Sequence, residues 1–291
     1  MRDATAVVVN FNSGDRLGRL LDSLEGEVGT VVVVDNASSD GSLDAAEGRT
    51  SVEALRNDTN SGFAAAANRG AVGARGAWIV FVNPDAHPLP GQVDALIEDL
   101  RPDVAVVAPL QMDANGRPLA ETGGYDPSLP RFLLWSVIPT RFHGRRGPWI
   151  APPFPREDVK LDWVSGAMMA VRREVFEWLG GFDERFFLYQ EDVDFGRRAR
   201  AAGYRVVCRA SVRVEHEVAQ GDPVRRSEEA QRFVESLGLQ FHGWRRRVLG
   251  MALLVGFGLR SIAGSPGRRA AAGASLLPSF ALIRRAPARR A

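Results

Sequence analysis

Short runs of β-branched and aliphatic residues alternate with stretches of helical periodicity through the first third of the chain. The apolar runs cover residues 5–9, 30–34, 51–55 and 78–82, and helical stretches at 17–24 and 63–74 lie between them. Strands that are apolar almost throughout are typical of a parallel sheet covered by helices on both faces. The pattern therefore predicts an α/β fold with a Rossmann-like, mainly parallel central sheet.

The middle of the chain has a different character. A strand predicted at residues 104–108 leads into residues 125–155, which are rich in proline, glycine and aromatic residues and show no clear periodicity. We interpret this section as an excursion over the site that faces the acceptor. Regular structure is predicted again at 163–171, and a helix is expected from Glu191 to Ala201, with Gly203 as its C-terminal stop.

After His216 the chain becomes helical and basic. An amphipathic helix is predicted at residues 227–239, and apolar runs at 248–259 and 276–283 are flanked by arginines. Both runs are shorter than the roughly 20 residues that a membrane-spanning helix needs. We divide the chain into a domain of residues 1–225 and a helical, arginine-rich extension of residues 226–291 that lies close to a membrane. The alternative is a C-terminal helix packed on the domain.

Charge is distributed unevenly along the 291 residues. The net charge is +2, but residues 241–291 hold ten arginines and no acidic residue, which leaves about −8 on residues 1–240. An acidic body argues against a nucleic-acid partner. A basic, apolar end suits the anionic inner leaflet of a membrane. The single cysteine, Cys208, suits a reducing compartment, and the first residues lack a signal-peptide layout. We expect a cytoplasmic protein at the inner face of the cell membrane.

Polar residues follow the predicted strands, where parallel sheets bind their ligands. Asp35 and Asn36 offer hydrogen-bond partners for a ribose and a base. Gly62 permits close backbone approach just ahead of a helix, and the N-terminus of that helix suits a diphosphate. These residues predict a nucleotide site.

Three further motifs offer acid–base or metal chemistry. Asp85 follows the strand at 78–82, and its carboxylate with two diphosphate oxygens would seat Mg²⁺ or Mn²⁺, with His216 as a further ligand. Glu191 and Asp192 begin a helix, where a carboxylate can remove a proton from an acceptor hydroxyl. Each motif also has a plain structural interpretation: an ordinary turn, a solvated histidine and an acidic helix start.

Taken in order, these motifs closely resemble those of the family 2 glycosyltransferases, which have the GT-A fold, and more narrowly their bacterial rhamnosyltransferase-like branch. The resemblance is carried by residues 7–12, 33–42, 57–68, 82–85, 163–167, 181–187, 191–194 and 216. It implies an inverting, metal-dependent transfer of a sugar to a hydroxyl of a cell-envelope glycan or polyprenyl-linked acceptor. The donor that it favours is dTDP-L-rhamnose.

The resemblance also implies roles for individual residues. Asp192 would be the general base with Glu191 beside it, and Asp85 and His216 would bind Mg²⁺ or Mn²⁺. The residues expected to bind the donor are Asn10, Asn12, Asp35, Asn36, Asn60, Gly62, Phe63, Asn68 and Asn83. Two departures stand out: Asn83 replaces the first aspartate of the Asp-x-Asp metal motif, and Glu217 follows His216 where the family often has histidine and serine.

Other functions remain open alongside this one. A transferase of the same family could use a UDP-sugar such as UDP-galactofuranose or UDP-glucose, and an inactive nucleotide-sugar-binding scaffold could keep the same fold. A nucleotidyltransferase would need a glycine-rich N-terminal loop with a basic residue, which residues 12–15 do not supply. A Rossmann oxidoreductase would need a Gly-x-Gly-x-x-Gly motif after the first strand, which is missing.

Overall fold

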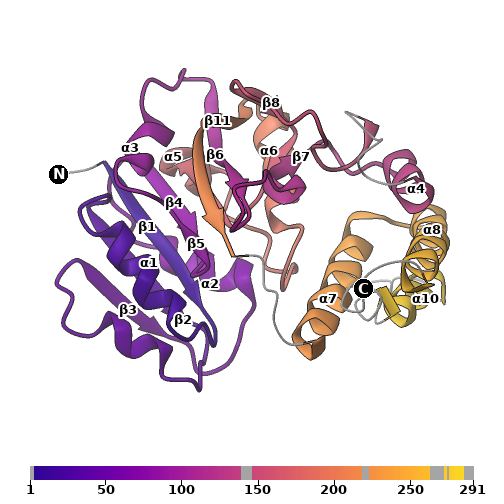
Figure 1. Ribbon diagram of the computed structural model, residues 1–291, viewed down its shortest axis with the longest axis horizontal. Coiled ribbons are helices and arrows are strands. Elements are labelled where there is room, and N and C mark those ends of the chain that lie inside the picture. The colour runs from indigo at the N-terminus through magenta and orange to yellow at the C-terminus, as the bar shows by residue number, and fades with distance from the viewer. Residues whose placement is uncertain (1–2, 139–145, 218–222, 263–271, 274, 285–291) are drawn as a thin grey trace. The chain divides into compact units, whose positions relative to one another are not determined.

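The computed structural model describes residues 3–138, 146–217, 223–262, 272–273 and 275–284. The chain forms two compact units, which can be followed in Figure 1. The first comprises Met1–Gly124, Phe154–Arg185 and Glu191–Val218. The second comprises Tyr125–Pro153, Phe186–Gln190 and Ala219–Ala291.

The first unit is built on a nine-stranded sheet with the order β3-β2-β1-β4-β10-β6-β11-β5, in which β8 also pairs with β11. Its strands are β1 (Ala4–Asn10), β2 (Thr30–Asp35), β3 (Val52–Arg56), β4 (Trp78–Val82), β5 (Ala86–His87), β6 (Val104–Met112), β8 (Val159–Leu161), β10 (Met168–Arg172) and β11 (Arg205–His216). Strands β1 to β4 pair in parallel, as do β6 and β11. Strands β5, β8 and β10 run antiparallel to their neighbours. The predicted mainly parallel α/β sheet is confirmed.

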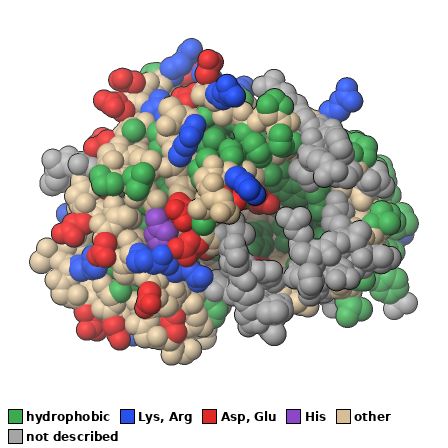
Figure 2. Space-filling model, in the orientation of Figure 1, with side chains coloured by type: hydrophobic (Ala, Val, Ile, Leu, Met, Phe, Trp, Pro, Cys, Tyr) green, Lys and Arg blue, Asp and Glu red, His purple; other side chains and the backbone are tan. Residues whose placement is uncertain are grey.

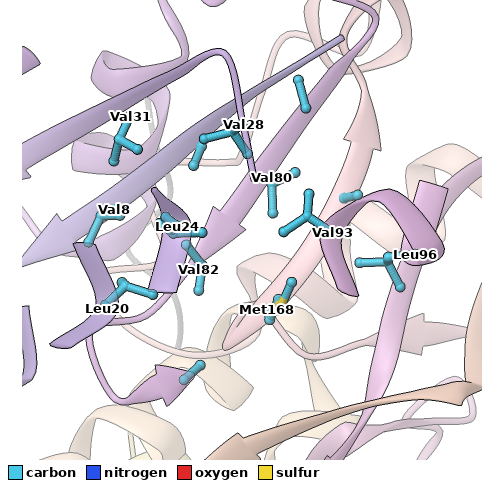
Figure 3. Close-up of a cluster of buried hydrophobic side chains, with 14 of the residues drawn as sticks. Val8, Leu20, Leu24, Val28, Val31, Val80, Val82, Val93, Leu96 and Met168 are labelled. Carbon is cyan, nitrogen blue, oxygen red and sulfur yellow. The ribbon is translucent and has the colours of Figure 1, made fainter. Parts of the chain in front are cut away.

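Helices cover both faces of this sheet because successive side chains of each strand point to opposite sides. Val31 and Val33 of β2 pack in one core with Leu20 and Leu24 of helix α1 (Arg16–Leu24). Figure 3 shows this core, which also takes in Val80, Val93 and Met168. The intervening β2 residues, Val32 and Val34, pack instead with Ala66 of helix α2 (Phe63–Ala71).

Shorter elements complete the first unit. They are η1 (Ser42–Ala46), α3 (Gln92–Ile97), η2 (Ala120–Thr122), α5 (Arg173–Trp178), α6 (Glu191–Ala201) and a two-stranded sheet of β7 (Gly123–Gly124) and β9 (Trp163–Val164). Helix α6 ends where the sequence predicts, and Gly203 has the left-handed φ of 92° expected after a helix end. Strand β11 continues to His216 through an irregularity in its pairing with β6 between Arg209 and Arg213.

The second unit packs helices around an aromatic and aliphatic core. Its helices are α4 (Leu129–Val137), α7 (Pro223–Gln240), α8 (Trp244–Ile262) and α10 (Leu276–Arg284). Phe132 of α4 packs with Leu237 and Phe241 of the α7 region and with Leu249 and Leu253 of α8. None of the helices in the described ranges is both long enough and apolar enough to cross a bilayer.

The second unit differs from the extension that we delimited from the sequence at residue 226. It also includes residues 125–153 and 186–190, which we had placed in the first domain. Helix α4 lay hidden in the section without clear periodicity, because its nine residues are fewer than the roughly 11–18 over which a helical period is recognised. Residues 139–145 of the predicted excursion and 285–291 of the arginine-rich end lie outside the described residues.

Candidate active site

Asp85 and His216 come together where β4 and β11 end. Strand β4 leads into the turn at Asn83, and β5 then pairs with β11 so that Ala86 lies opposite His216. As a result His216 Nε2 lies 3.4 Å from Asp85 Oδ1, although the two residues are 131 positions apart in the chain. Histidine, acidic and arginine side chains gather on this part of the surface shown in Figure 2.

The hydrogen bond on the other side of the His216 ring sets its chemistry. Nδ1 lies 3.1 Å from Oε1 of the fully buried Gln111. In the tautomer that carries its proton on Nδ1, Nε2 is an acceptor. It then faces the buried Asp85 Oδ1, which has no hydrogen-bond partner among the described residues. In that tautomer His216 Nε2 and Asp85 Oδ1 are two facing acceptors, an arrangement that fits a shared cation.

Asp85 and His216 therefore fit a divalent cation such as Mg²⁺ or Mn²⁺ as two of its ligands. Across the ranges that the structure describes, no group of three or more His, Cys, Asp or Glu side chains is arranged to hold a metal ion. Substrate oxygens and waters would have to supply the other ligands, as they commonly do for Mg²⁺.

Glu217 ties this site to helix α1. Its backbone N–H donates to the Asp85 carbonyl oxygen at 2.9 Å. Its carboxylate accepts from Arg16 at 3.2 Å and from Arg19 at 2.6 Å, and these arginines lower the pKa of Glu217. The residue that departs from the family pattern thus holds the end of β11 against both α1 and Asp85. Residues 218–222, which follow it, lie outside the described residues.

Asp192 is connected to the turn that carries Asp85 through the loop between β9 and β10. Gly166 of this loop donates its N–H to Asp192 Oδ2 at 3.1 Å. The next residue, Ala167, accepts from the N–H of Asn83 at 2.8 Å. One three-residue loop therefore contacts both the candidate base and the turn that carries Asp85.

Glu191 lies deeper than Asp192 at the start of α6. It is 4% exposed, and its Oε2 has no hydrogen-bond partner within the described part of the chain. Burial, followed by the neighbouring Asp192, raises the pKa of Glu191 well above its usual range. Burial also raises the pKa of Asp192 to about 6, although the N–H groups of Gly166 and Val193 oppose that shift. A carboxyl with such a pKa is suited to proton transfer near neutral pH.

Phe63 and Glu191 both border Gly166. A Cβ placed on Gly166 would lie 3.6 Å from the Phe63 ring and 3.9 Å from Glu191 Oε1. The absence of a side chain at position 166 thus leaves space bordered by Phe63, Glu191 and Asp192. The start of α2 is predicted to bind the donor, and the start of α6 is predicted to supply the base. Both helix starts border Gly166.

The nucleotide loops lie at the carboxyl ends of β1 and β2, where Asn10 is in register with Asp35. Asn10 is fully buried, and its amide donates to Asp35 Oδ1 at 2.8 Å and to Ser42 Oγ at 2.9 Å. Asp35 also accepts from the N–H of Ser38. Asn12, with a φ of 48°, accepts from the N–H of Ser39. The side chains of these residues therefore shape the loops that border the edge.

Asn36 organises the loop that precedes α2. Its Nδ2 donates to Asn60 Oδ1 at 2.8 Å and to the Gly62 carbonyl at 3.1 Å, while its Oδ1 accepts from Ser61 and Asn57. Asn36 is 2% exposed. Gly62 has a φ of 85°, a conformation that favours glycine.

Asn68 was also predicted to bind the donor, but its side chain is hydrogen-bonded to Phe182 and Glu184. Its amide donates to the Phe182 carbonyl and to Glu184, and its Oδ1 accepts from the N–H of Phe182 at 2.8 Å. Asn68 thus fastens the turn at Gly181 to α2.

Gln111, Gly166 and Glu217 were missing from the predicted site residues. Gln111 is the one polar side chain inside the apolar run of β6, a signal that could have marked it. The contacts of Gly166 and Glu217 depend on strand pairing between distant parts of the chain, which the sequence does not display.

The comparisons with known proteins bear directly on this geometry. The sequence profile described as glycosyl transferase family 2 matches residues 5–179, more than half of the chain. The chain belongs to this family. Its match covers the donor loops and Asp85, whereas Asp192 and His216 follow the matched region.

Two relatives of this family 2 glycosyltransferase come from Mycobacterium tuberculosis. N-acetylglucosaminyl-diphospho-decaprenol L-rhamnosyltransferase is 34% identical over 243 residues, which cover 75% of this chain and 78% of the relative. Pre-mycofactocin glycosyltransferase is 31% identical over 208 residues, which cover 70% of this chain and 40% of the relative. The rhamnosyltransferase-like resemblance is confirmed.

Solved structures confirm the GT-A fold of this glycosyltransferase. The mannosyltransferase PcManGT of Pyrobaculum calidifontis, in complex with GDP-Man and Mn²⁺, is similar with a TM-score of 0.56 at 19% identity, over 97% of this chain and 84% of that one. GalNAc-T7 with UDP, GalNAc and Mn²⁺ gives a TM-score of 0.60 at 16% identity. The similarity covers 88% of this chain and about half, 51%, of GalNAc-T7.

Proposed function

We propose that this glycosyltransferase transfers L-rhamnose from dTDP-L-rhamnose to a hydroxyl of a polyprenyl-linked glycan, with inversion at the anomeric carbon. The observation that carries the proposal is the loop at Gly166 and Ala167, which contacts Asp192 on one side and the Asp85 turn on the other. A base and a diphosphate-binding group are thus held at one edge of the sheet.

On the donor side, Asp35 contacts the ribose or base. Asn10, Asn12, Asn36, Asn60 and Asn83 shape the loops that receive the nucleotide, and Asn68 steadies α2 through the turn at Gly181. The N-terminus of α2, with Gly62 and Phe63, faces the diphosphate. Asp85 and His216 hold Mg²⁺ or Mn²⁺, which when bound neutralises charge on the departing diphosphate.

The transfer is a single displacement. The acceptor oxygen forms a bond to the anomeric carbon, and the bond from that carbon to the diphosphate oxygen breaks, with its electron pair leaving on the nucleoside diphosphate. Asp192 takes the proton of the acceptor hydroxyl on the opposite face of the sugar. Glu191, buried beside it and with a raised pKa, keeps its proton and limits the negative charge near the base.

The acceptor is proposed from the relative, whose name describes a rhamnosyl transfer to N-acetylglucosaminyl-diphospho-decaprenol. A lipid-linked acceptor would lie in a membrane, and the arginine-rich C-terminal end suits the anionic inner leaflet. We therefore place the reaction at the inner face of the cell membrane.

The proposal is tested by a transfer assay with a panel of dTDP- and UDP-sugars, a short-chain polyprenyl-diphospho-N-acetylglucosamine acceptor, and Mn²⁺ or Mg²⁺. We expect product only with metal, and with dTDP-L-rhamnose at a kcat/KM at least tenfold above any UDP-sugar. The D85A variant serves as the control and should lose metal-dependent turnover.

A UDP-sugar is the second candidate donor, supported by the fold shared with GalNAc-T7 bound to UDP. A UDP-sugar that outperforms dTDP-L-rhamnose in the same panel would overturn the proposed donor. Nucleotide binding without transfer from any donor would favour a scaffold without catalytic activity.

A further inference from the structure

The outer face of helix α8 is an exposed apolar stripe. Trp244, Met251, Val255 and Leu259 are exposed by 66%, 51%, 52% and 54% of their surfaces. Their spacing of seven, four and four residues places them on one side of a helix. We call these four residues the outer stripe of α8.

The core of the second unit does not need the outer stripe. Leu249, Leu253 and Phe257, on the opposite side of α8, are at most 9% exposed and pack in the core with Phe132 and Leu237. A helix that already buries one apolar face normally shows polar residues to water on the other. A contiguous apolar face left exposed instead marks an interaction site.

Neighbouring helix α10 adds to this apolar surface. Leu277 and Phe280 are 81% and 42% exposed. The two helices approach closely, since a Cβ on Gly250 of α8 would lie 2.8 Å from the Ser279 carbonyl oxygen of α10. Exposed hydrophobic side chains, drawn green, lie along the edge of Figure 2 where Figure 1 places α8 and α10.

The charges around the outer stripe indicate its partner. The exposed Arg245 and Arg247 lie on either side of Trp244 around the helix, and the Arg245 guanidinium is 5.8 Å from the Trp244 ring. Residues 236–291 contain no Asp or Glu. A second copy of this segment therefore offers no carboxylate to these arginines, whereas anionic lipid headgroups complement them.

We infer that the outer stripe of α8 docks this protein onto an anionic lipid bilayer. The stripe enters the boundary between headgroups and acyl chains, and Arg245 and Arg247 contact lipid phosphates. Helix α8 lies along the surface, since no helix in the described ranges is long and apolar enough to span a bilayer. Docking requires no donor, metal ion or turnover, so its failure would leave the proposed transfer chemistry untouched.

Vesicle co-sedimentation of the full chain tests this inference. The M251E/V255E variant places two carboxylates on the outer stripe. The matched control, V72E/W178E, makes the same charge change at positions in the first unit that are 83% and 68% exposed. The vesicles contain phosphatidylcholine alone or phosphatidylcholine with phosphatidylglycerol.

We expect wild type and the control to bind the anionic vesicles at least tenfold more strongly than neutral ones. The outer-stripe variant should bind the anionic vesicles at least tenfold more weakly than wild type. Equal binding of all three proteins, or no binding of wild type to anionic vesicles, would overturn the inference.

A fluorescent label gives a second, independent readout. The single native cysteine, Cys208, is buried, and burial raises its pKa to about 12, so it resists labelling. An environment-sensitive dye on the V255C variant should shift to the blue when anionic vesicles are added, and the same dye on V72C should not. A shift on V255C that instead follows protein concentration without lipid, together with dimer formation, would assign the stripe to a second copy and overturn the inference.

Discussion

Two adjacent carboxyl groups at the start of α6 are placed in different surroundings. Glu191 is almost fully buried and lacks a hydrogen-bond partner for Oε2 within the described residues, whereas Asp192 accepts from the N–H groups of Gly166 and Val193. These hydrogen bonds favour the charged form of Asp192 and counter part of its desolvation. Burial thus raises the pKa of both carboxyls, and only Asp192 has backbone N–H groups that oppose the shift.

The raised pKa of Asp192 predicts the pH dependence of transfer. The base must be deprotonated to act, so a pKa of about 6 in the free protein makes kcat/KM for the acceptor rise as the pH rises through 6. We expect kcat/KM to be roughly tenfold lower at pH 5 than at pH 7. An aspartate with the usual pKa near 4 would give almost no change over this range.

The measurement is a kcat/KM profile for the acceptor from pH 5 to 8, with melting temperatures recorded across the same range to exclude unfolding. A profile that is flat between pH 5 and 7 would contradict the assignment of Asp192 as a base with a raised pKa.

At the scale of elements, helix α2 is fixed by contacts at its start and in its second half. Its start borders Glu191 and Gly166 through Phe63, and Asn68 further along fastens the turn at Gly181. Gly181 has a φ of 73°, and a Cβ there would lie 2.5 Å from Asn68 Oδ1. Both the backbone conformation and the close approach require glycine.

The Gly181→Ala substitution should therefore destabilise the fold more than a comparable glycine change. Gly26 is the matched control, because it has a similar φ of 71° with no atom within 4 Å of an added Cβ. We expect Gly26→Ala to cost about 1 kcal/mol, and Gly181→Ala about 1–3 kcal/mol more, because Asn68 must move. Urea denaturation measures the free energy of unfolding of both variants. Equal decreases in this free energy would show that the clash with Asn68 is relieved without cost.

The strands and helices of the first unit could largely be predicted from periodicity, since β1 to β4, α1 and α6 have the expected positions. The antiparallel direction of β10 could not, because an apolar strand buried on both faces has the same composition in either direction. Helix α4 was missed because its nine residues are too few to show a clear helical period.

Asp85 and His216 could be proposed from the sequence because polar residues that follow strands tend to meet at one edge. Their contact depends on β5 pairing with the last residues of β11, and the supporting Gln111 comes from a third strand. Such pairings join residues that are about 100 positions apart. Hydrophobic periodicity, which is a local signal, does not reveal them.

On the scale of the whole molecule, charge is separated along the chain. Residues 1–240, which carry a net charge of about −8, include the candidate active site. The ten arginines of residues 241–291 include Arg245 and Arg247, which lie beside the outer stripe of α8. An acidic surface is repelled by an anionic membrane and a basic one is attracted to it. This separation is the one expected if the C-terminal segment attaches the protein to an anionic membrane, as we propose.

The central claim is that Asp192 serves the chemistry while Asp85 and His216 serve donor binding. It is tested most directly by measuring kcat and dTDP affinity in the presence of Mn²⁺ on the Asp192→Asn variant. We expect kcat to fall by about 10²–10⁴-fold, because the general base is lost, with the dissociation constant for dTDP within about twofold of wild type. A variant that keeps more than a tenth of the wild-type kcat would show that Asp192 is not the base. A variant that loses dTDP binding and turnover together would show that the two roles are not separate.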